Sequence, residues 1–155
     1  MLNFISFNSI LHFKISMATT PTGQKTHESK NALISFETMK EFDGIVKDAK
    51  DAGATLIVCF STSWCGPCKR IAPFLKEQAE AFKNKPLVRL AKTVMEDDHE
   101  EELMEGLVTD YGIRITGVPH FAVIQNGMYV KDKSWSGANK ELLVERLAEF
   151  SSVGV

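Results

Sequence analysis

The chain has 155 residues, enough for one domain with a substantial hydrophobic core. With 44% hydrophobic and 25% charged residues, it has the composition of a soluble globular protein. A formal net charge of −2 excludes a general affinity for nucleic acid or anionic membranes, and three cysteines are too few for a disulfide framework. We therefore expect no nucleic-acid partner and no membrane partner.

The first 30 residues differ in composition from the rest. Polar side chains interrupt the apolar ones in residues 1–16, which have neither the basic start of a secretory signal nor the arginines of a mitochondrial presequence. Two interpretations stay open: a weak targeting leader, or an upstream extension with the real start at Met17. Residues 18–30 are polar and predict a flexible linker. We expect a folded domain at 31–150, a tail at 151–155, and cytoplasmic localisation unless the leader directs the protein to mitochondria or elsewhere.

The first half of the folded region predicts three strands that alternate with two helices, from short apolar runs and from apolar residues at helical spacing. In chain order we expect a strand at 32–36, a helix from Glu37 or Thr38 to Gly53, a strand at 55–60, a helix at 65–82 and a strand at 87–94. This order implies parallel strands joined by right-handed crossovers.

The second half begins with an acidic segment, 96–105, that holds seven acidic residues and merges into a helix ending near Gly112. The acids have two interpretations: a solvated helix start, where carboxylates suit the helix dipole, or an acidic docking surface that selects basic partners. Beyond it we expect a strand at 121–124, a hairpin turn at Asn126-Gly127, a strand at 128–131 and a last helix from Asn139 to Phe150.

Cys65 and Cys68 are separated by two residues at the predicted strand-to-helix junction. Free N–H groups and the macrodipole at a helix N-terminus favour negative charge, and therefore the reactive thiolate of Cys65. Pro67 suits a first helical turn, and Gly66 leaves the approach to the first sulfur open. A structural zinc site would need a second ligand pair, and none is spaced for it. The pattern predicts a dithiol that attacks a disulfide and then closes on itself.

Further motifs extend this pattern along the chain. They are Trp64-Cys65-Gly66-Pro67-Cys68-Lys69 after a buried strand, then Pro73, Tyr111-Gly112-Ile113-Arg114, Val118-Pro119, Asn126-Gly127 and Gly137. With these motifs in this order, from about residue 32 to 150, the chain resembles the thioredoxin family. The resemblance implies an α/β thioredoxin fold, in which a central mixed β-sheet is flanked by helices on both faces.

The resemblance also implies a protein-disulfide reductase. Cys65 would attack a substrate disulfide as the nucleophile, and Cys68 would resolve the mixed disulfide. No cofactor would be bound, because thioredoxin reductase would return electrons from NADPH. The implied partners are thioredoxin reductase and disulfide-containing proteins, and the chain is expected to act as a monomer.

Four residues would shape the site around the dithiol. Trp64 would flank it as an apolar contact surface, with packing into the core as the alternative. Pro119 would be the family's cis-proline, with the backbone of Val118 pairing with an extended substrate, and a trans proline is the alternative. His120 stands where threonine is common in the family. As a cation it would stabilise the Cys65 thiolate or shuttle a proton, and otherwise it is a groove residue fitted to one substrate.

Cys59 departs from the family pattern, because a buried aspartate is usual behind the second cysteine. A buried thiol is a poor base, so we expect slower resolution by Cys68 unless Lys92 and water assist. The alternatives for Cys59 are a small apolar core residue and a third redox thiol that exchanges with Cys68. Lys92 matches the lysine that pairs with the missing aspartate, and without that partner it is expected to extend to the surface.

Two other functions stay open at this point. In a redox-gated binding protein, the dithiol state would control association with a partner, and turnover would be slow because of Cys59. The other is an oxidase or isomerase, which the Gly66-Pro67 pair disfavours because that pair resembles reductases.

Overall fold

The computed structural model describes residues 32–96 and 98–152, so the expected leader at 1–30 lies outside the described residues. All the predicted helices and strands of the folded region are present, and they alternate as expected. In chain order they are β1 (Leu33–Ser35), α1 (Met39–Asp51), β2 (Thr55–Thr62), α2 (Gly66–Phe82), β3 (Val88–Met95), α3 (Glu100–Tyr111), β4 (His120–Gln125), β5 (Met128–Tyr129), η1 (Lys131–Lys133), β6 (Trp135–Ser136) and α4 (Lys140–Ser152).

The strands form one mixed sheet with the order β1-β3-β2-β4-β5, and β6 also pairs with β4. β1 and β2 run parallel to β3, whereas β4 runs antiparallel to β2. β2 lies in the middle, and all its side chains except that of Ser61 are buried. A strand covered on both faces needs no alternation of polar and apolar residues, which is why its sequence is a continuous apolar run. The mixed sheet and the parallel order of the first three strands are confirmed.

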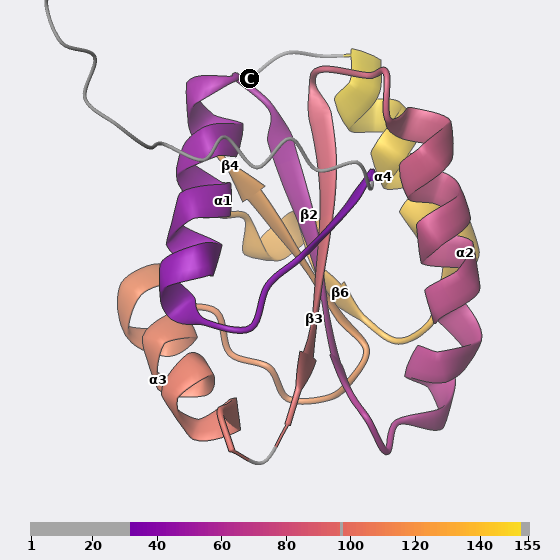
Figure 1. The fold of residues 1–155 in the computed structure, drawn as a ribbon. Coiled ribbons are helices and arrows are strands. Elements are labelled where there is room, and N and C mark those ends of the chain that lie inside the picture. The colour runs from indigo at the N-terminus through magenta and orange to yellow at the C-terminus, as the bar shows by residue number, and fades with distance from the viewer. Residues whose placement is uncertain (1–31, 97, 153–155) are drawn as a thin grey trace, which may run out of the picture.

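Helices cover both faces of this sheet, as Figure 1 shows, with α1 and α3 on one side and α2 and α4 on the other. Alternate residues of β2 point to the two faces. Leu56, Val58 and Phe60 enter the core under α1 and α3. Ile57 and Cys59 enter the core under α2 and α4. The central strand thus ties two separate hydrophobic cores together.

The edge beyond β4 differs from the prediction. Asn126 and Gly127 form the expected tight turn, with positive φ values of 53° and 79° that suit these two residue types. The strand after it ends at Tyr129 rather than at residue 131, because the chain turns into η1. There the N–H of Val130 still donates to the carbonyl of Val123 at 2.8 Å, but the N–H of Val123 donates to the hydroxyl of Ser134 at 2.9 Å, so a side chain replaces half of the next rung of the ladder.

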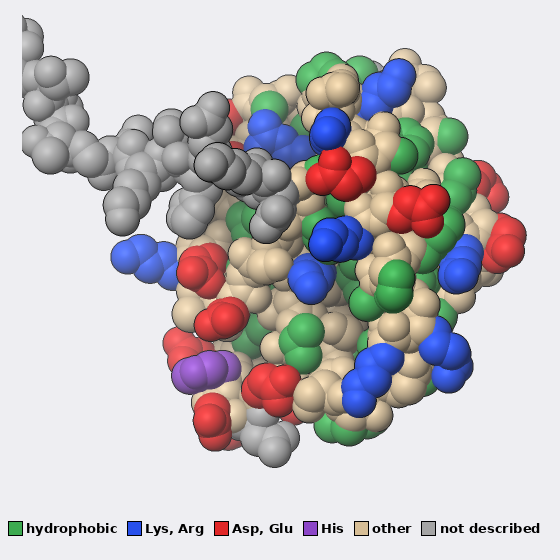
Figure 2. All heavy atoms as spheres, turned by 45° about the vertical axis from the view of Figure 1, so that its right-hand side comes forward, with side chains coloured by type: hydrophobic (Ala, Val, Ile, Leu, Met, Phe, Trp, Pro, Cys, Tyr) green, Lys and Arg blue, Asp and Glu red, His purple; other side chains and the backbone are tan. Residues whose placement is uncertain are grey.

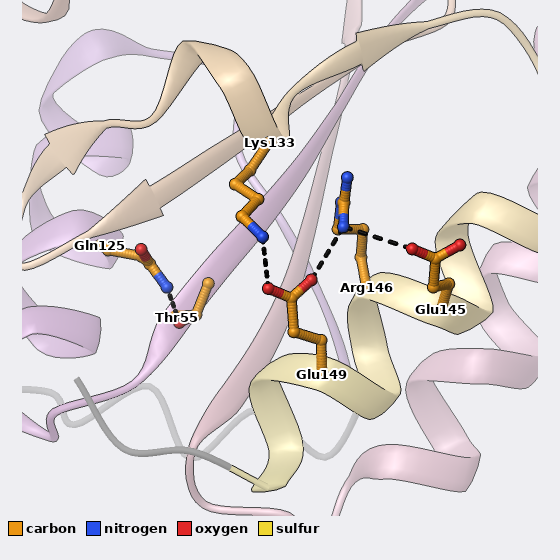
Figure 3. Close-up of polar contacts among 6 residues, drawn as sticks. All are labelled: Thr55, Gln125, Lys133, Glu145, Arg146 and Glu149. Atoms are coloured by element: carbon orange, nitrogen blue, oxygen red, sulfur yellow. Dashed lines mark hydrogen bonds and ion pairs between the residues drawn. The ribbon is translucent and has the colours of Figure 1, made fainter.

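Polar contacts join α4 to η1, and the end of β4 to the start of β2 (Figure 3). Glu149 of α4 binds Lys133 of η1 and Arg146 of its own helix, and the Arg146 contact measures 2.8 Å. The side-chain amide of Gln125 donates to the hydroxyl of Thr55 at 3.1 Å, which joins the end of β4 to the beginning of β2. These contacts reinforce the register that brings the other end of β2 to the dithiol.

Thr38 begins α1 as its N-cap, as the sequence predicts. Its hydroxyl accepts the N–H of Glu41 at 3.2 Å, and the Glu41 carboxylate accepts the N–H of Thr38 at 3.2 Å. This reciprocal pair is a capping box, which satisfies two backbone donors that the helix leaves free.

We expect Thr38→Ala to lower the free energy of unfolding by about 1 kcal/mol, because the helix loses this cap. Denaturant unfolding followed by circular dichroism measures the change. Thr109→Ala is the matched control, since it makes the same chemical change at an exposed position inside α3. Equal stability of the two variants would contradict the assignment of the cap.

Candidate active site

Cys65 lies at the junction between β2 and α2 as the N-cap of the helix. Its N–H donates to the carbonyl of Thr62 at 3.3 Å, and its own carbonyl accepts the N–H of Lys69 at 3.2 Å. Its sulfur takes the position of a capping oxygen and accepts the N–H of Cys68 at 3.2 Å. This arrangement directs a free helical N–H and the positive end of the helix dipole at one sulfur, as expected from the sequence.

Cys65 and Cys68 are joined by a disulfide, with their Cα atoms 5.3 Å apart. The structure therefore holds the oxidised form of the pair. Pro67 lies in the first turn of α2, where it costs no hydrogen bond. A Cβ at Gly66 would meet only the Arg70 side chain, at 3.7 Å, so the chain itself leaves the space in front of Gly66 open.

Trp64 precedes the dithiol and is 73% exposed, so it does not pack into the core. The Val118–Pro119 peptide bond is cis, as the family resemblance implies. Pro119 precedes β4, and its carbonyl accepts the N–H of Gly137 at 2.8 Å. β4 runs antiparallel to β2 and pairs His120 with Phe60. Pro119, which precedes β4, therefore lies at the end of the sheet where β2 stops and the chain continues to Cys65. A strand-to-helix dithiol and a cis-proline loop therefore meet at one end of the sheet.

A family model described as Thioredoxin matches residues 33–149. The chain belongs to the thioredoxin family. A thioredoxin from Geodia cydonium is 32% identical to it over 74% of this chain and 96% of its own length. A Thioredoxin H-type from Fagopyrum esculentum is 28% identical, over 78% of this chain and 93% of its own. Among solved structures, Plasmodium falciparum thioredoxin is 31% identical with a TM-score of 0.57, covering 76% of this chain and 98% of its own.

The fold agrees with that of a poplar thioredoxin h, which has a TM-score of 0.62 at 24% identity and covers 77% of this chain and 96% of its own. Membership of the family and the Cys65–Cys68 disulfide make this chain a thiol-disulfide oxidoreductase. Thioredoxins are protein-disulfide oxidoreductases that need no bound cofactor.

Cys59 lies in the core under α2 and α4 and is 4% exposed. Burial raises the pKa of Cys59 to about 12, and the charge of Lys92 on the neighbouring strand only partly opposes this. The two residues are direct partners in the register of β2 and β3. Lys92 is half-buried and lines a small hollow of about 190 Å³ with Lys76 and Glu80 of α2, and its extension to the surface stays a prediction. At neutral pH Cys59 keeps its proton, so this thioredoxin has no ionised acid at that position.

His120 is buried, with 6% of its surface exposed, and its role as a substrate-groove residue stays a prediction. Its Nδ1 lies 2.9 Å from the hydroxyl of Ser136 on β6, and its ring lies 6.4 Å from that of Phe60. Burial lowers the pKa of His120, which disfavours the cation at neutral pH and with it the stabilisation of a thiolate. The proton-shuttle role stays a prediction.

Sequence reasoning missed Ser136, which contacts His120. Trp135 and Ser136 pair with Phe121 and His120 as the short strand β6. A two-residue strand is too short to show an alternating pattern. The only sequence signal for β6 was Gly137, which indicates that an edge strand ends there. Ser136 is accordingly found only through the sheet register.

The described residues contain neither a cluster of metal ligands nor a helix that could span a membrane. Within 32–96 and 98–152, no three His, Cys, Asp or Glu side chains come together to hold a metal ion. The helices in these same residues are all too short or too polar to cross a membrane. Cytoplasmic localisation stays a prediction, because the leader that would decide it lies outside the described residues.

The buried His120 predicts a loss of stability in mild acid. The unfolded chain binds a proton near the ordinary histidine pKa of about 6.5, whereas native His120 binds one only at lower pH. The free energy of unfolding should therefore decrease as the pH falls from about 7 through that range. His120→Thr should reduce this dependence, since it removes the titrating group and introduces a β-branched residue, which suits a strand.

Denaturant unfolding at a series of pH values measures the effect. His99→Gln is the control, because it removes a histidine from an exposed position. An identical pH dependence in the native protein and in His120→Thr would show that His120 titrates normally.

Proposed function

We propose that Cys65 is the nucleophile and Cys68 the resolving thiol of a protein-disulfide reductase. The supporting observation is the asymmetry of the junction: the sulfur of Cys65 accepts the N–H of Cys68 at the start of α2. Exposure does not distinguish the two, since both side chains are about equally buried. A hydrogen bond and a helix dipole directed at Cys65 lower the cost of its thiolate, so Cys65 is the thiol that attacks first.

The reaction takes two exchanges. The Cys65 thiolate attacks one sulfur of the substrate disulfide, forming a bond to it, and the other substrate sulfur leaves as a thiolate that takes up a proton. Cys68 then loses its proton and attacks Cys65, releasing the second substrate thiolate. Substrate gains two electrons and two protons, and the protein is left with the Cys65–Cys68 disulfide that the structure contains. A monomer suffices, since both cysteines belong to one chain.

Reduction of insulin disulfides, with dithiothreitol as electron donor, tests this order. Cys65→Ser should abolish turnover and form no adduct. Cys68→Ser should stop turnover. After it has been reduced and freed of dithiothreitol, it should accumulate a protein–insulin mixed disulfide, visible on a non-reducing gel or by mass spectrometry. Adducts on Cys65→Ser and none on Cys68→Ser would reverse the two roles.

We infer that a dedicated reductase returns the protein to its dithiol form, with NADPH and thioredoxin reductase as the source of electrons. One similar solved structure is a thioredoxin f2 in complex with ferredoxin:thioredoxin reductase, with 28% identity, a TM-score of 0.58 and coverage of 76% of this chain and 93% of that one. This complex supports a reductase as partner of our chain. It also suggests ferredoxin:thioredoxin reductase as a second electron donor, beside NADPH-dependent thioredoxin reductase. NADPH oxidation with thioredoxin reductase, run beside reduction by ferredoxin:thioredoxin reductase, separates the two donors.

The second candidate function is a redox-gated binding protein with slow turnover. The observation that favours it is Cys59, whose pKa of about 12 leaves no proton acceptor at that position. Without an acceptor, deprotonation of Cys68 would depend on water or Lys92, and the mixed disulfide with a partner would last longer.

Cys59→Asp distinguishes a working reductase from this alternative. We expect faster release of the mixed disulfide near neutral pH, because a carboxylate accepts the proton of Cys68. The fold should lose stability, since a charge is buried beside Lys92. Stopped-flow Trp fluorescence follows the release step, and Cys59→Ala controls for the loss of the thiol. Equal release rates in all three proteins would rule out a role for position 59 in resolution.

A further inference from the structure

The connection between β3 and α3 leaves the sheet at the same end as the dithiol (Figure 1). In the register of β2 and β3, Thr62 pairs with Met95 at the last rung. The chain reaches Cys65 three residues after Thr62, and it begins the acidic segment directly after Met95. Figure 1 shows the start of α2 and the start of α3 at the same end of the molecule. The acidic segment and the loop that holds Cys65 therefore leave neighbouring strands at the same end of the sheet.

A hollow of about 360 Å³ opens in this connection. We call it the acidic hollow, and it is lined by Glu37, Val94, Met95, Glu96, Asp98, His99 and Leu103. Its floor is apolar, because Met95 and Leu103 are buried core residues, and Val94 is 43% exposed. Three carboxylates, Glu37, Glu96 and Asp98, accompany this floor, and all three residues are exposed.

The carboxylates of the acidic hollow are not neutralised within the described residues. The ion pairs found there lie elsewhere, on α1, at the end of α2, and between α4 and η1. Figure 2 shows acidic side chains gathered around a histidine at the lower left of the view, whereas most Lys and Arg side chains of this face lie toward its middle and right. The hollow thus combines an apolar floor with unpaired negative charge.

Helix stability does not explain these charges. Carboxylates in the first turn of α3, at Glu100, Glu101 and Glu102, suit the helix dipole. Glu96 and Asp98 lie before that helix, and Glu37 comes from the connection between β1 and α1. Two separate connections therefore bring acids to one apolar hollow.

We propose that the acidic hollow is a docking surface for protein substrates that carry a Lys or Arg close to their disulfide. The methylene stem of such a residue packs on Val94, the exposed apolar side chain of the lining, and its cationic end meets the three carboxylates. The attraction favours encounter at Cys65 and weakens with salt. This inference rests on the proposed function, whose substrate class it narrows.

The test uses three synthetic peptides with one disulfide and one sequence, differing only in flanking Lys, Ala or Glu residues. The full chain is compared with the E37Q/E96Q/D98N variant. The matched control is D48N/E77Q/D132N, which removes the same charge at exposed positions outside the acidic hollow. We expect kcat/KM for the Lys peptide to exceed that for the Glu peptide by roughly five- to tenfold at low salt, from a few exposed ion pairs. The preference should vanish in E37Q/E96Q/D98N and at high salt, and persist in the control.

Binding is measured separately from turnover, with the Lys peptide in which Ser replaces both cysteines. NMR shift changes at Val94, Met95 and Leu103 in the native protein, and weaker binding by E37Q/E96Q/D98N, are the expected result. Failure to reduce the Ala peptide, with these shifts intact, would overturn the proposed function and leave the docking surface standing. Reduction of all three peptides at equal rates without these shifts would overturn the docking surface alone. Shifts that depend on protein concentration without peptide would assign the hollow to a second copy of this chain and also overturn the proposal.

Discussion

The site depends on the burial of β2 between β3, which runs parallel to it, and β4, which runs antiparallel. Its side chains alternate between the two cores, so the strand cannot slip by one residue without exchanging its apolar faces. Cys65 follows only three residues after the strand ends. The reactive sulfur is therefore held by the packing of the whole sheet, and the N-terminus of α2 is positioned with it.

The register of β2 also decides what surrounds the dithiol. On one side, β3 ends beside Thr62 and leads into the acidic segment. On the other side, β4 begins with His120 paired to Phe60, directly after cis-Pro119. Residues that are far apart in the sequence thus meet at one end of the sheet, because each belongs to a loop that leaves a strand beside β2.

Much of this could be predicted from the sequence. The apolar run of β2, the capped helices and the Asn126-Gly127 turn are local signals, and each is decided by a few neighbouring residues. The family resemblance supplied the cis bond before Pro119, which no local pattern indicates. The side of the sheet that His120 faces could not be predicted, because it depends on the register between β4 and β2. The early end of β5 depends on a hydrogen bond from Val123 to the Ser134 hydroxyl, eleven residues away.

Charge is distributed unevenly between the inside and the outside of the site. Cys59 and His120 point to opposite faces of the sheet, and burial favours the neutral form of each at neutral pH. Since neither carries a charge, the field at Cys65 comes from the α2 dipole and from groups on the surface. We expect the backbone groups near cis-Pro119 to contact every substrate alike, whereas the proposed docking surface at Glu37, Glu96 and Asp98 distinguishes one substrate charge from another. The two loops beside β2 therefore have different proposed roles. The loop before β4 offers backbone groups to any substrate, and the loop after β3 selects substrates by their charge.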